Sequence, residues 1–157
     1  MMEIVIQTAG AFFAIFGFSI LLDVPKKFLF WTSGSGAVGW LAYILALAGG
    51  RSPIMAAFLS SLAASLFSHT VARIMKAPVT VFLVAGILPT VPGASIYRCV
   101  YYLIQAEPSL SSFYLIQTLQ IAGAMALAIF IVDSLFRLTQ KPQGREEKGE
   151  KGSSVCG

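Results

Sequence analysis

The sequence predicts an all-α integral membrane protein with five transmembrane helices. Hydrophobic residues make up 57% of the 157 positions and charged residues only 11%, a balance far from that of a water-soluble domain. A spanning helix needs about 20 mostly apolar residues, and five such runs follow one another along the chain. The basic residues gather in alternate connections between these runs, as expected for a multi-pass protein.

The first three helices are bounded by residues that start or stop helices. Residues 3–22 form the first, which ends at Asp23; no basic segment precedes it, so we expect a retained helix rather than a signal peptide. Residues 28–48 form the second, up to a pair of glycines. The third begins near Ser52, a favourable N-cap that is followed by proline, and it continues to residue 76.

The fourth apolar run is expected to be split and the fifth to be continuous. The fourth forms two half-helices, residues 79–88 and 94–105, and the fifth helix covers residues 109–138. The prediction is thus one transmembrane domain, residues 1–138. It is followed by a charged, glycine-rich tail, residues 139–157, which we expect to be disordered and cytoplasmic.

The lysines and arginines predict an N-terminus outside and a C-terminus inside. In this orientation the outer side receives only Arg51, and Arg98 is left within the membrane. The inner side receives Lys26, Lys27, Arg73, Lys76, Arg137, Lys141, Arg145, Lys148 and Lys151. This bias explains the net charge of +4, and no basic-aromatic surface or motif indicates binding to nucleic acid.

No motif indicates catalysis, a metal or another cofactor. Cys99 lies in an apolar run and Cys156 in the tail, so they suggest neither a disulfide framework nor a metal cluster. Ser65 and His69 are four residues apart on one helix, which stacks their side chains and does not aim a hydroxyl at a base. No span contains paired carboxylates. We therefore expect a protein that is not an enzyme.

Small residues at fourfold spacing predict close helix packing. In lipid, such ridges let helices approach and exchange hydrogen bonds. The third helix has two of them, Ala56, Ser60, Ala64 and Ser68, and Ala57, Ser61, Ser65, His69 and Arg73. These residues are expected to face protein.

Four polar residues within the spans have two interpretations each. His69 is either a proton-coupling group, because imidazole titrates near neutral pH, or a histidine hydrogen-bonded at a helix interface. Asp133 is either a second coupling group or an ion-pair partner of Arg137, one turn later. Gln117 and Gln120 form interhelical hydrogen bonds or line a cavity.

The segment PTVPGASIYR is expected to interrupt the fourth span. Pro89 and Pro92 cannot donate to the carbonyls of Ala85 and Leu88, which would leave these two acceptors free. Gly93 lowers the barrier to unwinding. Non-helical backbone at membrane depth is tolerated only where protein or a water-filled cavity surrounds it.

The start of the second half-helix is a candidate anion site. The amides of Gly93, Ala94 and Ser95 would lack intrahelical acceptors and present partial positive charge. Arg98 follows within one turn and could reach the same space, while the freed carbonyls could accept from an ammonium group or a cation. The alternative is a structural kink in which Arg98 pairs with Asp133 or Glu107 or extends to the outer headgroups.

The segment from Ile87 to Arg98, I-L-P-x-V-P-G-x-x-x-Y-R, together with the five spans and the length of the chain, resembles the threonine/serine exporter family of ThrE type. The resemblance is to its small YjjB-like membrane subunit and covers about residues 1–138. It implies export of small amino or carboxylic acids, threonine and serine or succinate, driven by the proton motive force. It also implies a larger YjjP-like partner subunit and a bacterial inner membrane. The positions that match the motif are Pro89, Pro92, Gly93, Tyr97 and Arg98.

The expected substrate-binding residues are therefore Pro89, Pro92, Gly93, Ser95, Tyr97 and Arg98, and the candidate proton-coupling residues are His69 and Asp133. Two other functions fit the same sequence. One is a non-transporting scaffold that docks a partner through small residues such as Ala64 and Ser68, and the other is a channel formed by several copies of the chain.

Overall fold

The computed structural model describes residues 2–139, and within this range every regular element is helical. The predicted tail at residues 140–157, with Lys141, Arg145, Lys148, Lys151 and Cys156, lies outside the described residues. The elements are α1 (Met2–Leu21), α2 (Lys26–Ala48), α3 (Pro53–Met75), α4 (Val79–Ile87), the 3₁₀ turn η1 (Leu88–Thr90), α5 (Gly93–Ile104) and α6 (Pro108–Thr139).

Four of these helices, α1, α2, α3 and α6, are each long and apolar enough to cross a membrane. The fifth candidate span consists of two shorter pieces, residues 79–90 and 93–104, whose axes differ by 51°. Within the described residues the protein is therefore an all-helical chain with four candidate spans, or five if the bent pair counts as one. Ser52 caps α3 as predicted, because its Oγ accepts from the amide of Met55 at 3.4 Å.

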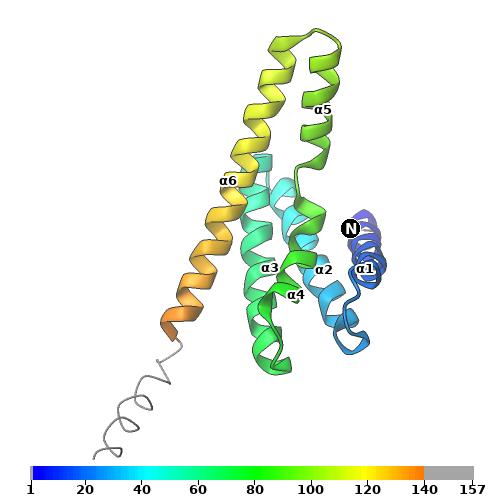
Figure 1. Ribbon diagram of the computed structural model, residues 1–157, viewed down its shortest axis with the longest axis vertical. Helices are drawn as coiled ribbons and strands as arrows, with labels where there is room; N and C mark the ends of the chain where they lie inside the picture. The colour runs from blue at the N-terminus through cyan, green and yellow to red at the C-terminus, as the bar shows by residue number, and fades with distance from the viewer. Residues whose placement is uncertain (1, 140–157) are drawn as a thin grey trace, which may run out of the picture.

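The helices form two unequal parts (Figure 1). In one part, α4 packs against α2 and α3, and α1 packs mainly against α2, with a few contacts to α4 and η1. In the other part, α5 and the first half of α6 form a hairpin that extends beyond the ends of α1, α2 and α3, while the second half of α6 runs back along α3. Among the helices of the described chain, α5 packs against α6 alone.

The start of α1 and the end of α6 point to opposite ends of the molecule (Figure 1). The connection from α2 to α3 lies toward the same end as the α5–α6 turn, and the connection from α3 to α4 lies at the other. If the bent pair crosses the membrane, the chain has five crossings. Because five is an odd number, the two termini then emerge on opposite sides.

Small residues allow α2, α3 and α4 to touch backbone to backbone. A Cβ on Gly86 would lie 2.7 Å from Ser35 Oγ, closer than real Cβ contacts. Ser35 Oγ donates to the carbonyl of Phe82 at 2.9 Å, and Ser60 Oγ donates to the carbonyl of Gly39 at 2.7 Å. These hydrogen bonds satisfy hydroxyls between the helices, as expected for small-residue packing in lipid.

The scaffold hypothesis placed the docking face on α3, and the structure corrects this. Ala64 and Ser68 are fully buried within the chain itself, and Ala64 packs close to Gly39 and Gly86. Because α2 and α4 already occupy this face of α3, no partner can reach it. Substitutions there would disturb the fold of the chain before they affected any assembly.

Candidate functional site

The helix break lies between α4 and α5, where two prolines divide the backbone. Pro89 sits in η1, and Pro92 is the residue before the first turn of α5. The carbonyls that were expected to be free are bonded: the amide of Leu88 donates to Ala85 O, and that of Val91 donates to Leu88 O at 3.3 Å. The chain tightens into a 3₁₀ turn, in which an amide donates to the carbonyl three residues before it instead of four. The amides of Leu88 and Val91 can therefore bond to these carbonyls, although Pro89 and Pro92 have no amide proton to donate. They are therefore not a ready-made cation site, contrary to the sequence prediction.

The amides at the start of α5 are partly as expected. The amide of Gly93 donates to Val91 O at 2.7 Å, so it is not available to bind a ligand. Those of Ala94 and Ser95 have no backbone acceptor in the described part of the chain, and both residues line a pocket of about 250 Å³. We call this the Arg98 pocket. Two free amides at a helix N-terminus present partial positive charge toward it.

The Arg98 pocket lies at the level where the α5–α6 hairpin leaves the other helices. Its floor and walls come from the later part of α2, from the start of α3, from η1, from the start of α5 and from the first half of α6. Its polar lining residues are Trp40, Tyr43, Thr90, Ser95, Arg98 and Gln117. The volume would hold several water molecules, at about 30 Å³ each, or a small organic acid in their place.

Among the described residues, Arg98 is the one charged residue in the lining, and no carboxylate of residues 2–139 accompanies it there. The guanidinium lies 5.6 Å from the centre of the Tyr114 ring, a contact that supports the cation without neutralising it. Among the described residues it forms no ion pair with Asp133 or Glu107. The pocket therefore combines one uncompensated cation with polar groups, an arrangement suited to an anionic group.

The sequence-predicted residues are distributed as follows. Pro89, Pro92, Ser95 and Arg98 line the Arg98 pocket. Gly93 begins α5 but is not part of the lining, and a Cβ placed on it would meet nothing within 4 Å. Tyr97 lies outside the lining, is 69% exposed and stacks on Tyr101.

Sequence reasoning missed part of the lining. Trp40 and Tyr43 form a stacked pair with ring centres 5.3 Å apart, and Thr90 donates its hydroxyl to Ile87 O at 2.9 Å. For Gln117, left between two interpretations, the structure gives cavity lining, whereas Gln120 on the same helix is exposed. The spacing of Trp40 and Tyr43, three residues apart near the end of a helix, could have indicated that they line a common site. Aromatic residues are common near the ends of any transmembrane helix, however, so this spacing was not specific.

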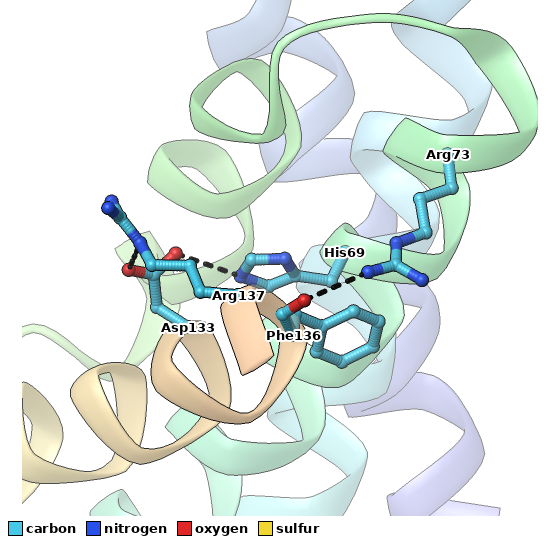
Figure 2. Close-up of polar contacts among 5 residues, drawn as sticks. All are labelled: His69, Arg73, Asp133, Phe136 and Arg137. Atoms are coloured by element: carbon cyan, nitrogen blue, oxygen red, sulfur yellow. Dashed lines mark hydrogen bonds and ion pairs between the residues drawn. The ribbon is translucent and has the colours of Figure 1, made fainter. Parts of the chain in front are cut away.

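The second candidate group, His69 and Asp133, gathers near the far end of α3 (Figure 2). His69 Nε2 lies 3.8 Å from Asp133 Oδ1, and Asp133 Oδ2 accepts from Arg137 Nε at 2.7 Å. The predicted ion pair between Asp133 and Arg137 is thus present, and His69 joins it from the neighbouring helix. The sequence did not predict this meeting, because it depends on how α6 lies along α3.

The ring of Phe136 completes this group, which we call the His69–Asp133 cluster. The imidazole of His69 stacks on it at 4.6 Å, and Arg73 lies over it while Arg73 Nη2 donates to Phe136 O at 3.1 Å. Figure 2 shows the carboxylate of Asp133 between His69 and Arg137, with Arg73 on the other side of Phe136. The cluster and the Arg98 pocket are separate sites. Ala57, which lines the pocket, and His69 lie roughly 18 Å apart along α3, at a rise of about 1.5 Å per residue.

Comparison with known proteins supplies the family. A family model described as threonine/serine exporter, ThrE, matches residues 7–135, most of the chain. The chain belongs to the threonine/serine exporter family. Neither a curated protein nor a solved structure matches it. The match covers all of α2 to α5 and most of α1 and α6. The Arg98 pocket lies within the matched range, as do His69 and Asp133, whereas Phe136 and Arg137 follow its last residue.

Family membership confirms the resemblance drawn from the Ile87–Arg98 segment. It also gives the chain an exporter-type transport role in a membrane that it crosses several times, and it points away from an enzyme. Within the described residues, no three His, Cys, Asp or Glu side chains come together in a way that could hold a metal ion.

Proposed function

We propose that the chain is the small subunit of a two-component secondary exporter. It moves small amino or carboxylic acids, of the threonine/serine or succinate type, out of the cell at the expense of the proton motive force. The broken α4–α5 segment crosses the membrane as one span, with the N-terminus outside and the C-terminus inside a bacterial inner membrane. The partner is a larger YjjP-like membrane subunit of the same family.

The observation that carries this proposal is the unpaired guanidinium of Arg98 at the helix break. Arginine within an apolar chain is expensive unless a partner balances it, and no described carboxylate does so. A substrate carboxylate can take that place, with paired hydrogen bonds from the guanidinium and further ones from the amides of Ala94 and Ser95.

The rest of the lining supports a small polar acid. The oxygens of Thr90 and Gln117 can accept from an ammonium or hydroxyl group, and the Trp40–Tyr43 stack offers an aromatic face to a cation. The charge of the described lining comes from Arg98, and no described acidic residue is there to bind a cation. A substrate without a carboxylate would therefore gain little in this pocket.

The shape of the chain supports a partner subunit. The α5 wall of the pocket is backed by α6 alone, and Ala94 and Arg98 are exposed. A transport site must be closed off from lipid on every side, so a further protein surface is needed along α5. The partner subunit would supply it.

Proton coupling is assigned to the His69–Asp133 cluster. His69 is buried between α3 and α6, and its Nε2 lies 3.8 Å from Asp133 Oδ1, so a protonated imidazole would face a negative charge. Its distance from the Arg98 pocket means that coupling would act through movement of α6 against α3.

Export by cells that produce the full-length chain with its larger subunit tests the proposal. We expect Arg98→Ala to lower efflux of the acid to less than about one hundredth, because the carboxylate loses its charged partner. Arg98→Lys keeps the charge but not the paired hydrogen bonds and should retain part of the activity. Arg51→Ala is the matched control, because Arg51 is exposed and is not part of the pocket lining, and this variant should export normally.

Two other outcomes favour other functions. Normal efflux by an Arg98→Ala chain that is present in the membrane at wild-type amounts would favour a scaffold. Flux through this chain alone in liposomes, without dependence on a proton gradient, would favour a channel of several copies.

A further inference from the structure

The interface between α3 and α6 connects the two sites. Within the described chain, α3 is the one helix packed against the second half of α6. Ala57 of α3 forms a buried cluster with Ile121 and Met125 of α6 near the Arg98 pocket, and His69 reaches Asp133 at the other end. We call this interface the α3–α6 seam; its α3 side is Ala57, Ser61, Ser65 and His69, and its α6 side is Ile121, Met125, Ala128 and Val132.

Both sides of the seam follow helical spacing. The α3 residues recur every four positions, so Ser61 and Ser65 lie between two residues that already contact α6. The α6 residues recur at intervals of four, three and four, and all of them are buried. Because α3 is their one neighbour in this half of α6, it is α3 that covers them.

The two serines on the seam have no hydrogen-bond partner. Ser61 and Ser65 are 0% exposed, and neither Oγ bonds to anything in the described chain. Elsewhere in the same protein, Thr32, Thr70 and Thr118 donate to the carbonyl four residues before them. Two other buried serines of the described chain, Ser19 and Ser68, also have an unpartnered hydroxyl, and both lie outside the seam.

Serine is a poor choice for this interface as it stands. The facing side chains of α6 are all apolar, so they offer no acceptor to Ser61 or Ser65. A buried hydroxyl without a partner destabilises the folded state, and alanine would fill nearly the same space without that penalty. The serines therefore indicate a second arrangement in which the seam is wet.

The position of the seam shows which two sites a hydrated seam would connect. Ala57 and Ile121 line the Arg98 pocket as well as the seam, and the His69–Asp133 cluster closes the far end. The polar contacts that join α3 to α6 at that end are His69 with Asp133 and Arg73 with the carbonyl of Phe136. Between the two ends the seam is held by small and apolar contacts only, which can separate without breaking hydrogen bonds.

We propose that the α3–α6 seam is the closed form of the path between the Arg98 pocket and the side of the membrane at which α3 ends. When α6 moves away from α3, Ser61 and Ser65 line a narrow hydrated crevice through which water and the small carboxylic or amino acid pass. This proposal rests on the proposed export function and adds the route to it.

The test uses the full-length chain in its native membrane together with its larger subunit. Cys99 and Cys156 are first replaced by serine, and export by this parent is measured. Single Ser61→Cys and Ser65→Cys chains are then treated with a small thiosulfonate that carries an ammonium group, and the rate of labelling is followed. Ser60→Cys is the matched control, since Ser60 is equally buried, next to Ser61, and faces the carbonyl of Gly39 on α2.

We expect the Ser61→Cys and Ser65→Cys chains to be labelled at least tenfold faster than the Ser60→Cys chain, and the rate to change when the exported acid is supplied. Equal rates at all three positions, or no labelling at Ser61→Cys and Ser65→Cys in a parent that exports, overturn the seam proposal and leave the proposed function standing. Wild-type chains that export nothing together with the larger subunit overturn the proposed function and the seam proposal with it.

Alanine variants provide a second measurement that does not depend on a reactive thiol. The double variant Ser61→Ala with Ser65→Ala should be at least as resistant to heat in detergent as the wild type, because it removes two unpartnered hydroxyls. Its export should nevertheless fall severalfold, because a narrow crevice lined only by apolar side chains wets poorly. Unchanged export by this variant contradicts the proposal. Ser60→Ala should do the reverse, lowering heat resistance while each folded molecule exports normally.

Discussion

Gly39 and Gly86 face each other so closely that a Cβ on Gly39 would lie 3.1 Å from the carbonyl oxygen of Gly86. This contact fixes the depth to which α4 enters between α2 and α3, and α4 in turn carries η1 and the Arg98 pocket. The position of the pocket therefore depends on the absence of two methyl groups.

A methyl group at Gly86 should loosen this packing. The new Cβ of Gly86→Ala would lie 2.7 Å from Ser35 Oγ and 3.2 Å from Ser35 Cβ, so α2 and α4 must move apart. We expect a loss of about 1–3 kcal/mol in stability, the usual range for overpacking. Thermal denaturation of the detergent-solubilised chain measures it.

Gly17→Ala is the control for that substitution. Gly17 lies within α1, and a Cβ there meets nothing within 4 Å. Alanine should be neutral or stabilising by up to about 1 kcal/mol, through its better helix propensity. If both variants melt at the same temperature, the close approach of α4 is not a source of stability.

Gln117 tests the polar lining of the Arg98 pocket apart from its charge. Gln117→Leu keeps the size of the side chain but removes its hydrogen-bonding groups, so the KM for export should rise roughly tenfold, equivalent to about 1.4 kcal/mol. Gln120→Leu, three residues along α6 and exposed, should change KM less than twofold. Similar KM values for the two variants would mean that Gln117 does not meet the substrate.

The His69–Asp133 cluster makes separate predictions for coupling and for packing. Glutamine has no proton to exchange near neutral pH, so His69→Gln should remain in the membrane yet lose export against a concentration gradient. A protonophore should then have no further effect. Uphill export by the variant would show that the histidine is structural.

Arg137→Gln is the matched control in the same cluster. The side chain of Arg137 is 78% exposed, and exposed ion pairs are worth less than about 1 kcal/mol. Stability and export should both stay close to those of the wild type, because His69 still faces Asp133 at 3.8 Å. A loss of uphill export here as large as in His69→Gln would assign coupling to the whole charged group.

The orientation can be tested with single cysteines at the two ends of the molecule. Glu107 lies at the α5–α6 turn and Thr80 at the start of α4, and both are exposed. In intact cells a membrane-impermeant thiol reagent should label the Glu107→Cys chain and should reach the Thr80→Cys chain only after permeabilisation. The opposite pattern would reverse the proposed topology.

The sequence by itself determined the elements. Runs of apolar residues set the number of candidate spans, and start and stop residues such as Ser52 and Pro92 set their ends to within a few positions. The cause is local, since helix length, capping and proline geometry depend on neighbours within one or two turns. The Ile87–Arg98 segment was also sufficient to indicate the family.

The tertiary structure decided which of these residues meet. It placed Gln117 in the lining of the Arg98 pocket and Tyr97 outside it, and it brought His69 on α3 to Asp133 on α6. It also showed that the carbonyls of Ala85 and Leu88 are bonded, because a 3₁₀ turn is an alternative to a helix that sequence spacing does not reveal. In lipid, helix association depends on close fit and on a few polar contacts, and both depend on the rotation of each helix about its axis.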